Sequence, residues 1–153
     1  MKGRLLALTW AITPAWAFAC SFAGLEHDVQ FTAASMHLDS KQVLPLRNWF
    51  VEQQNPKRAT GGIYRADIFA RAIKDDPVSL EKANLRLAEI VNLLRASSNT
   101  ASLEVQGHID EFESKDIQHP ERLDVLNATV QPACAKTLSC CKWIDGLVAQ
   151  PKE

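Results

Sequence analysis

The sequence predicts an α+β fold in which the elements follow the order strand, helix, strand, helix, strand, strand (βαβαββ). Two kinds of pattern carry this prediction. In some segments apolar and polar residues alternate, as in a half-buried strand, and in others apolar residues recur at three- and four-residue steps, as in an amphipathic helix. Because such elements must bury their apolar faces against each other, we expect a two-layer sandwich with both helices on one face of the sheet.

The first strand and helix are expected between residues 29 and 54. Residues 29–32 alternate apolar and polar side chains. Asp39 is placed to cap the helix that follows, and Asn55 and Pro56 are placed to end it. The apolar stripe of this helix comprises Val43, Leu46 and Phe50, with Trp49 beside it.

The second strand and helix are expected between residues 63 and 94. Residues 63–71 predict a strand that places Tyr64, Ala66, Ile68 and Ala70 on one face and polar residues on the other, apart from Phe69. Ser79 is the expected N-cap of the second helix. The apolar residues of that helix recur at helical spacing: Leu80, Ala83, Leu87, Ile90, Val91 and Leu94.

Two further strands are expected near the end of the chain. After the polar loop at residues 97–100, Leu103, Val105 and Ile109 alternate with polar residues and give the clearest strand pattern in the sequence. A closing strand at residues 122–126 is implied by a family resemblance.

The first 19 residues have the features of a secretory signal peptide. A basic start is followed by an apolar run at residues 5–12, a helix-breaking Pro14 and small residues at Ala17 and Ala19. Cleavage before Cys20 would leave one domain at residues 20–132 and a cysteine-containing tail at residues 133–153. No later apolar run is long enough to cross a membrane.

The four cysteines, Cys20, Cys134, Cys140 and Cys141, indicate disulfides, because their number is even and the chain is expected to be exported. Neighbouring cysteines rarely pair with each other. We therefore expect Cys20 to join one of the other three and the remaining two to close a short loop. The sequence leaves the connectivity open.

Two other roles for these cysteines are less favoured. Cys20 resembles the acylated cysteine of a lipoprotein, but Ala17 stands where a larger aliphatic residue is usual. A metal site formed by the C-terminal cysteines and His119 is disfavoured by the oxidising compartment, so no metal is expected.

Charge and motifs exclude several function classes. The formal net charge is −1 and the pI is about 6.4. The chain therefore lacks the excess of positive charge that attracts a polyanion, and no nucleic-acid partner is expected. The chain lacks a nucleophile elbow, a phosphate loop and a zinc motif, which predicts neither an enzyme nor a cofactor. The acidic residues at 110–116 are interpreted as a hydrated loop.

The segment 63–83 resembles the OmpA-like peptidoglycan-binding domain. In that family a strand ends in Gly-His-Thr-Asp and the next helix opens with Leu-Ser-x-Arg-Arg-Ala. Asp67 and Lys82 have the family's spacing between the aspartate and the second basic residue. Weaker matches at residues 29–38, at Leu103 with Gly107, and at residues 122–126 extend the resemblance over roughly residues 27–130.

The resemblance implies a mixed sheet, a periplasmic location and a ligand site. In the family, the aspartate and the arginine clamp the diaminopimelate residue of the peptidoglycan stem peptide. Asp67 and Lys82 stand in those places. Asp75 stands near the position at which the family has an asparagine that assists ligand binding. Lysine offers a point charge where arginine offers a planar fork, and Tyr64 replaces a glycine that lets the ligand approach the backbone.

A second alignment is open, because residues 106–110 also match Gly-His-Thr-Asp. It would make the helix at residues 79–94 the first helix of the domain, and no adequate second helix would follow. The first alignment is therefore preferred.

Asp67 and Lys82 also have an alternative interpretation, in which they are a solvated surface pair that binds no ligand.

Two functions are considered. The preferred one is an exported, non-enzymatic envelope protein that binds peptidoglycan or an envelope protein. The alternative is a small disulfide-stapled periplasmic immunity or inhibitor protein that binds a toxin or hydrolase.

Overall fold

The computed structural model describes residues 24–137 and 139–140, and these residues follow the predicted βαβαββ order. The principal elements are β1 (Glu26–Gln30), α1 (Ser40–Gln53), β2 (Ile63–Ile73), α2 (Pro77–Ala96), β3 (Glu104–Phe112), β4 (Val125–Pro132) and the short α3 (Ala133–Lys136). Two 3-10 turns, η1 (Ser114–Asp116) and η2 (Pro120–Asp124), lie between β3 and β4.

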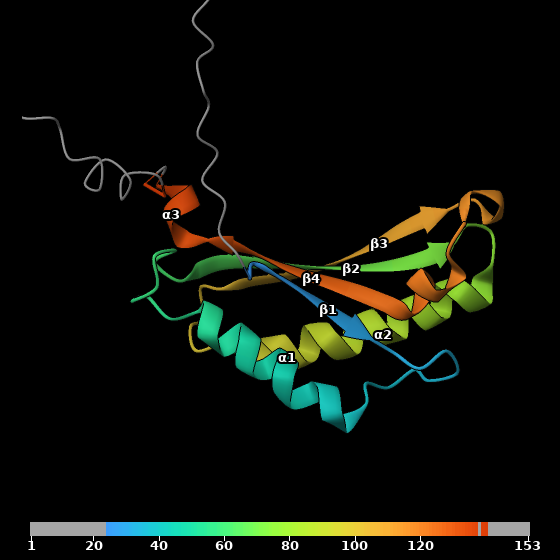
Figure 1. The fold of residues 1–153 in the computed structure, drawn as a ribbon, viewed down its shortest axis with the longest axis horizontal. Coiled ribbons are helices and arrows are strands. Elements are labelled where there is room, and N and C mark those ends of the chain that lie inside the picture. The colour runs from blue at the N-terminus through green and yellow to red at the C-terminus, as the bar shows by residue number, and fades with distance from the viewer. Residues whose placement is uncertain (1–23, 138, 141–153) are drawn as a thin grey trace, which may run out of the picture.

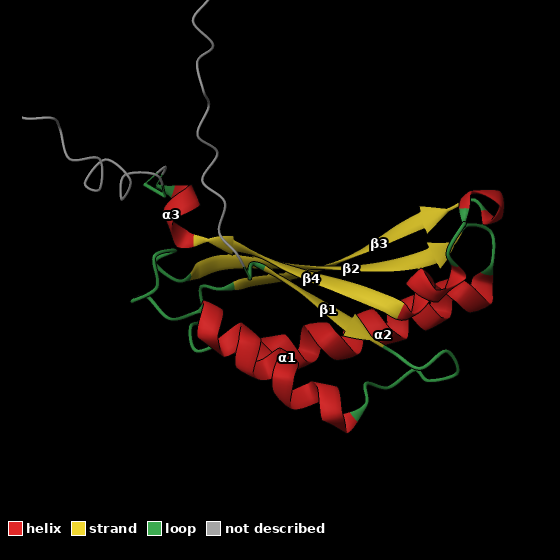
Figure 2. Ribbon diagram, viewed as in Figure 1, coloured by secondary structure: helices red, strands yellow, loops and turns green. Residues whose placement is uncertain are grey.

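The four strands form one mixed sheet in the order β1-β4-β2-β3. Strands β2 and β3 are parallel and are connected through α2, whereas β4 lies antiparallel between β1 and β2. Both long helices cover the same face of the sheet, and no described element covers the other face, which we call the open face (Figures 1 and 2). The predicted α+β two-layer sandwich is therefore confirmed.

The core lies between the sheet and the two helices. From β2, the alanines at 66, 70 and 72 and Ile68 point into it and are almost fully buried. They meet a stripe of α2 that comprises Ala83, Leu87, Ile90, Val91 and Leu94. The alternation of β2 and the helical spacing of α2 thus produce the packing that they predict, apart from Leu80, which is 37% exposed.

Helix α1 is capped as predicted, since the Asp39 carboxylate accepts a hydrogen bond from the Lys41 backbone N–H (2.8 Å). The N-cap predicted for α2 is wrong. Helix α2 begins at Pro77 after the N-cap Asp76, whose carboxylate accepts from the Val78 N–H (3.0 Å). The Ser79 hydroxyl instead accepts a hydrogen bond from the Ile73 N–H (2.9 Å) and so ties the end of β2 to the helix.

The closing strand begins later than predicted. Residues 122–124 belong to η2, and β4 starts at Val125. The difference arises because the Leu123 carbonyl and the Asp124 carboxylate accept hydrogen bonds from Arg86 of α2. These bonds turn the segment toward the helix layer before the strand begins.

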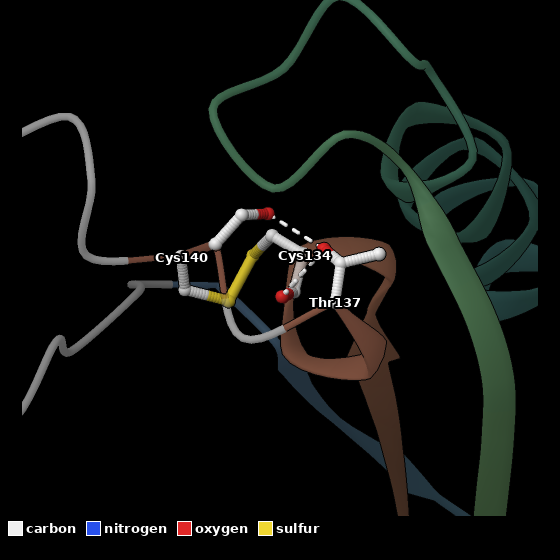
Figure 3. The surroundings of a disulfide bond; sticks show 4 residues. Cys134, Thr137 and Cys140 are labelled. Atoms are coloured by element: carbon white, nitrogen blue, oxygen red, sulfur yellow. Dashed lines mark hydrogen bonds between the residues drawn. A yellow bond between two sulfur atoms is a disulfide. The ribbon is translucent and has the colours of Figure 1, made fainter.

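A disulfide joins Cys134 to Cys140 and closes a loop with a sequence separation of 6 (Figure 3). Inside this loop the Thr137 hydroxyl donates a hydrogen bond to the Cys134 carbonyl (3.2 Å). The expectation that two of the C-terminal cysteines close a short loop is confirmed. Cys20 and Cys141 lie outside the described residues, and a bond between them stays a prediction.

We expect that replacing both Cys134 and Cys140 by Ser lowers the free energy of unfolding by about 2 kcal/mol, because a short loop closed in the unfolded state contributes roughly that amount. Urea denaturation of the oxidised protein and of the double variant measures the effect. Equal midpoints for the two proteins would contradict the expectation.

Among the described residues, no helix combines the length and the apolar composition needed to cross a membrane.

Candidate functional site

Asp67, the predicted acidic ligand residue, lies in the interior of β2 and faces the open side of the sheet. Arg65 grips its carboxylate through Nε (2.9 Å to Oδ2) and Nη2 (2.7 Å to Oδ1). His108 of β3 contacts the same carboxylate through Nε2 (2.9 Å to Oδ1). The Asp67 side chain is only 7% exposed beneath these partners. It is therefore engaged by neighbouring strand residues.

The environment of Asp67 moves its pKa in two directions. Burial raises the pKa, but the hydrogen bonds and positive charges of Arg65 and His108 outweigh that effect and leave the pKa below its ordinary value of 3.8. A lowered carboxyl pKa stabilises the folded state above the unfolded pKa, and this contribution is lost as the pH falls through the folded pKa.

We therefore expect Asp67→Asn to be less stable than the wild type at pH 7 and the difference to shrink below about pH 4. Urea denaturation of both proteins between pH 7 and pH 3 measures this change. Asp28→Asn serves as a control, because Asp28 is an exposed carboxylate on the same face of the sheet. A wild-type advantage that stays constant down to pH 3 would contradict the expectation.

Lys82, the predicted basic ligand residue, lies on α2 on the helix side of the sheet. Its ammonium group pairs with Asp124 (2.9 Å from Nζ to Oδ1) and also donates to the Ala33 carbonyl. The expectation that Asp67 and Lys82 point into one pocket is wrong, because successive residues of β2 face opposite sides. Ala66 and Ile68 occupy the helix side, which leaves Asp67 on the open face.

Asp75 belongs to the tight turn between β2 and α2. It is exposed and adopts a positive φ of 63°, a conformation that Asp tolerates better than most residues. The structure does not bring Asp75 into contact with Asp67 or Lys82. Ligand binding by Asp67, Lys82 or Asp75 stays a prediction.

Sequence reasoning missed Arg86, which is the largest fully buried side chain among the described residues. Its guanidinium pairs with Asp124 (2.8 Å) beside Lys82. Asp124 is thus shared by two cations. Burial raises the pKa of Asp124. The hydrogen bonds and charges of Arg86 and Lys82 lower it by more, so the pKa lies below its ordinary value. The position of Arg86, three residues after Ala83 and four before Ile90, was a signal that it lies on the buried stripe of α2.

Lys82 lines a surface hollow at the turn between β2 and α2, which we call the turn hollow. Its volume is about 220 Å³. It is lined by Arg71, Ile73, Asp76, Val78, Ser79, Lys82, Ala83 and Leu123. The Lys82, Arg86 and Asp124 group carries a net charge of +1, and Arg71 adds a further positive charge. The hollow therefore offers an electropositive wall and one carboxylate, Asp76.

No group of three or more His, Cys, Asp or Glu side chains in the described part of the chain is arranged to hold a metal ion.

Comparison with known proteins finds no matching family model and no matching curated protein. Among solved structures, the chain is similar to the OmpA-like domain of FopA1 from Francisella tularensis, at 12% identity over 71% of this chain and 75% of that one, with a TM-score of 0.46. It is also similar to the C-terminal domain of Helicobacter pylori MotB (residues 125–256), at 12% identity over 81% of this chain and 98% of that one, with a TM-score of 0.49.

A longer periplasmic fragment of Helicobacter pylori MotB (residues 97–256) is similar at 13% identity over 81% of this chain and 93% of that one, with a TM-score of 0.43. Of these structures, that of FopA1 is described as an OmpA-like domain. At these identities and TM-scores, the assignment of the fold rests on the strand order and on the placement of the helices.

Proposed function

We propose that this chain is an exported, non-catalytic module of the cell envelope and that its turn hollow binds a carboxylate of the peptidoglycan stem peptide. The observation that carries the proposal is the position of Lys82. This residue matches the basic position of the OmpA-like pattern, and it lines the turn hollow together with a second cation, Arg71.

The charges of the turn hollow suit a ligand that carries both a carboxylate and an ammonium group, as diaminopimelate does. Arg71 forms no ion pair with any described carboxylate, and its planar guanidinium can grip a ligand carboxylate in a bidentate manner. Lys82 contributes a point charge, part of which Asp124 already neutralises.

Asp76 takes the acidic role in this arrangement, because Asp67 lies on the opposite side of the sheet. One Asp76 carboxylate oxygen accepts the capping hydrogen bond from Val78, and the other is left to receive a ligand ammonium group. Asp75 is the neighbouring residue in the turn and adds a second negative charge next to Asp76 in the sequence. The proposed site therefore keeps the residue types of the family clamp and changes the position of the acid.

Sedimentation with purified diaminopimelate-type peptidoglycan tests the proposal. We expect Arg71→Gln and Lys82→Gln each to lower retention about tenfold, because each removes a charge-assisted hydrogen bond. Asp67→Asn should retain wild-type binding, as should the control Lys41→Gln, which changes an exposed lysine on α1.

Equal retention of all four variants and the wild type would remove the turn hollow from consideration. Loss of binding in Asp67→Asn alone would instead place the ligand on the open face. Absence of any retention, together with co-purification of a single toxin or hydrolase, would favour the immunity or inhibitor function.

A further inference from the structure

A second hollow lies next to the turn hollow, at the C-terminal ends of β2 and β3, and is lined mainly by residues of the segment between β3 and β4. We call it the outer hollow. Its volume is about 210 Å³. It is lined by Arg71, Phe112, Asp116, Ile117, Gln118, His119, Arg122 and Leu123. It shares only Arg71 and Leu123 with the turn hollow.

Apolar side chains form part of the outer hollow. Phe112, the last residue of the edge strand β3, is 37% exposed, and Ile117 and Leu123 are partly exposed. Phe112 belongs neither to the hydrophobic core nor to the partly buried residues that pack against it. Together these three side chains offer a small apolar surface to a ligand.

Two arginines border this apolar surface without a carboxylate partner in the described part of the chain. Arg71 makes only a long hydrogen bond from Nη1 to the Arg122 carbonyl (3.5 Å), and Arg122 takes part in no ion pair there. The neighbouring His119 is held by Glu121 (3.0 Å). Asp116 is the one acid among the lining residues, which also include the two arginines.

We propose that the outer hollow binds the C-terminal carboxylate of a peptide whose last residue has a small apolar side chain. Arg122 and Arg71 hold the carboxylate, because guanidinium groups match its planar geometry. Phe112, Ile117 and Leu123 contact the apolar side chain. A hollow of about 210 Å³ has room for one small residue and its carboxylate.

This inference goes beyond the proposed function, because it depends on Arg122 and the apolar side chains and uses neither Lys82 nor Asp76; Arg71 lines both hollows. The ligand chemistry has two sources, a peptidoglycan stem peptide with D-residues or a protein C-terminus with L-residues. N-acetyl-D-alanyl-D-alanine and N-acetyl-L-alanyl-L-alanine distinguish these sources. The C-terminal amide of each peptide lacks the negative charge of the carboxylate and serves as its control. Titration of the ¹⁵N-labelled chain by NMR reports binding at the backbone amides of the lining residues.

We expect saturable shifts of the Phe112, Ile117 and Leu123 amides with the acids and binding at least about tenfold weaker with the amides. Arg122→Gln should weaken binding of the acids about tenfold. The control Arg47→Gln, which changes an exposed arginine of α1, should bind as the wild type does. A preference for the D- or the L-peptide supports the proposal and identifies the source.

Equal binding of acids and amides, or unchanged binding in Arg122→Gln, would overturn the proposal. Lys82→Gln separates the two sites. If this variant loses the shifts at Phe112, Ile117 and Leu123, the peptide occupies the turn hollow and the inference fails. If it keeps them but no longer sediments with peptidoglycan, both sites are supported. If even the wild-type chain is not retained by peptidoglycan while the acid peptides still bind, only the proposed function fails.

Discussion

Replacing Arg86 by Ala is expected to lower the free energy of unfolding by about 3–5 kcal/mol, because it removes a buried ion pair together with several buried hydrogen bonds. Arg86 is 1% exposed, and Asp124 would keep Lys82 as its one remaining cationic partner among the described residues. Typical domains have only about 5–15 kcal/mol of stability in total. A change of this size would therefore leave the variant marginally folded.

The guanidinium of Arg86 also satisfies backbone groups from two other segments. It donates to the carbonyls of Thr32 (2.8 Å), Ser35 (2.9 Å) and Leu123 (3.3 Å), and it lies 4.8 Å from the ring centroid of Phe31. The loop after β1 and the turn η2 are thus fastened to α2 by one side chain. Without it the Ser35 and Leu123 carbonyls lose this donor, whereas the Thr32 carbonyl still accepts from the Ser35 N–H (2.9 Å). Each buried group left unsatisfied adds to the cost.

Arg95→Ala is the matched control. Arg95 lies on the same helix, is exposed and donates one hydrogen bond to the Val105 carbonyl (2.9 Å). We expect it to cost about 1 kcal/mol or less. Urea denaturation measures both variants. Similar losses for Arg86→Ala and Arg95→Ala would show that the buried arginine does not fasten the two segments.

The order of the elements could be read from the sequence because it depends on local patterns. Asp39 caps α1, and the apolar stripe of α2 and the alternation of β3 lie where the periodicity places them. The boundaries near residues 79 and 122 were wrong because distant partners decide them. Ser79 contacts Ile73 of the preceding strand, and Leu123 and Asp124 contact Arg86.

The site was predicted less well than the fold. Lys82, which the spacing predicts to be a ligand residue, lines a surface hollow, and its ligand binding stays a prediction. The same spacing placed Asp67 beside it, although the alternation of β2 already assigned Asp67 to the face opposite Ala66 and Ile68. The strand also continues to Ile73, because β3 pairs with β2 as far as Phe112. A motif that marks the end of a strand in the family therefore falls in the interior of a strand here.

The buried role of Arg86 was harder to predict. Its position on the apolar stripe was visible, but its partners come from the loop after β1 and from η2, which are distant in the sequence. The two arginines of the outer hollow were hidden for the same reason, because Arg71 and Arg122 meet only when η2 packs beside β2.

Replacing Phe50 by Ala is expected to lower the free energy of unfolding by about 3–5 kcal/mol, the usual cost of removing a large ring from a packed core. Phe50 is fully buried and, with Leu46, is one of the two apolar side chains that α1 buries completely. Pro45 lies inside this helix and removes a backbone donor, so α1 depends on these core contacts more than on its own hydrogen bonds.

The adjacent Val51 provides the control, since it is 46% exposed and Val51→Ala should change stability by no more than about 0.5 kcal/mol. Phe50→Leu should fall between the two, because it retains most of the apolar volume. Hydrogen exchange locates the effect. If α1 depends on Phe50, the amides of α1 lose protection in Phe50→Ala before those of β2 and α2, whereas uniform loss over all three elements would show that the ring stabilises the whole core at once.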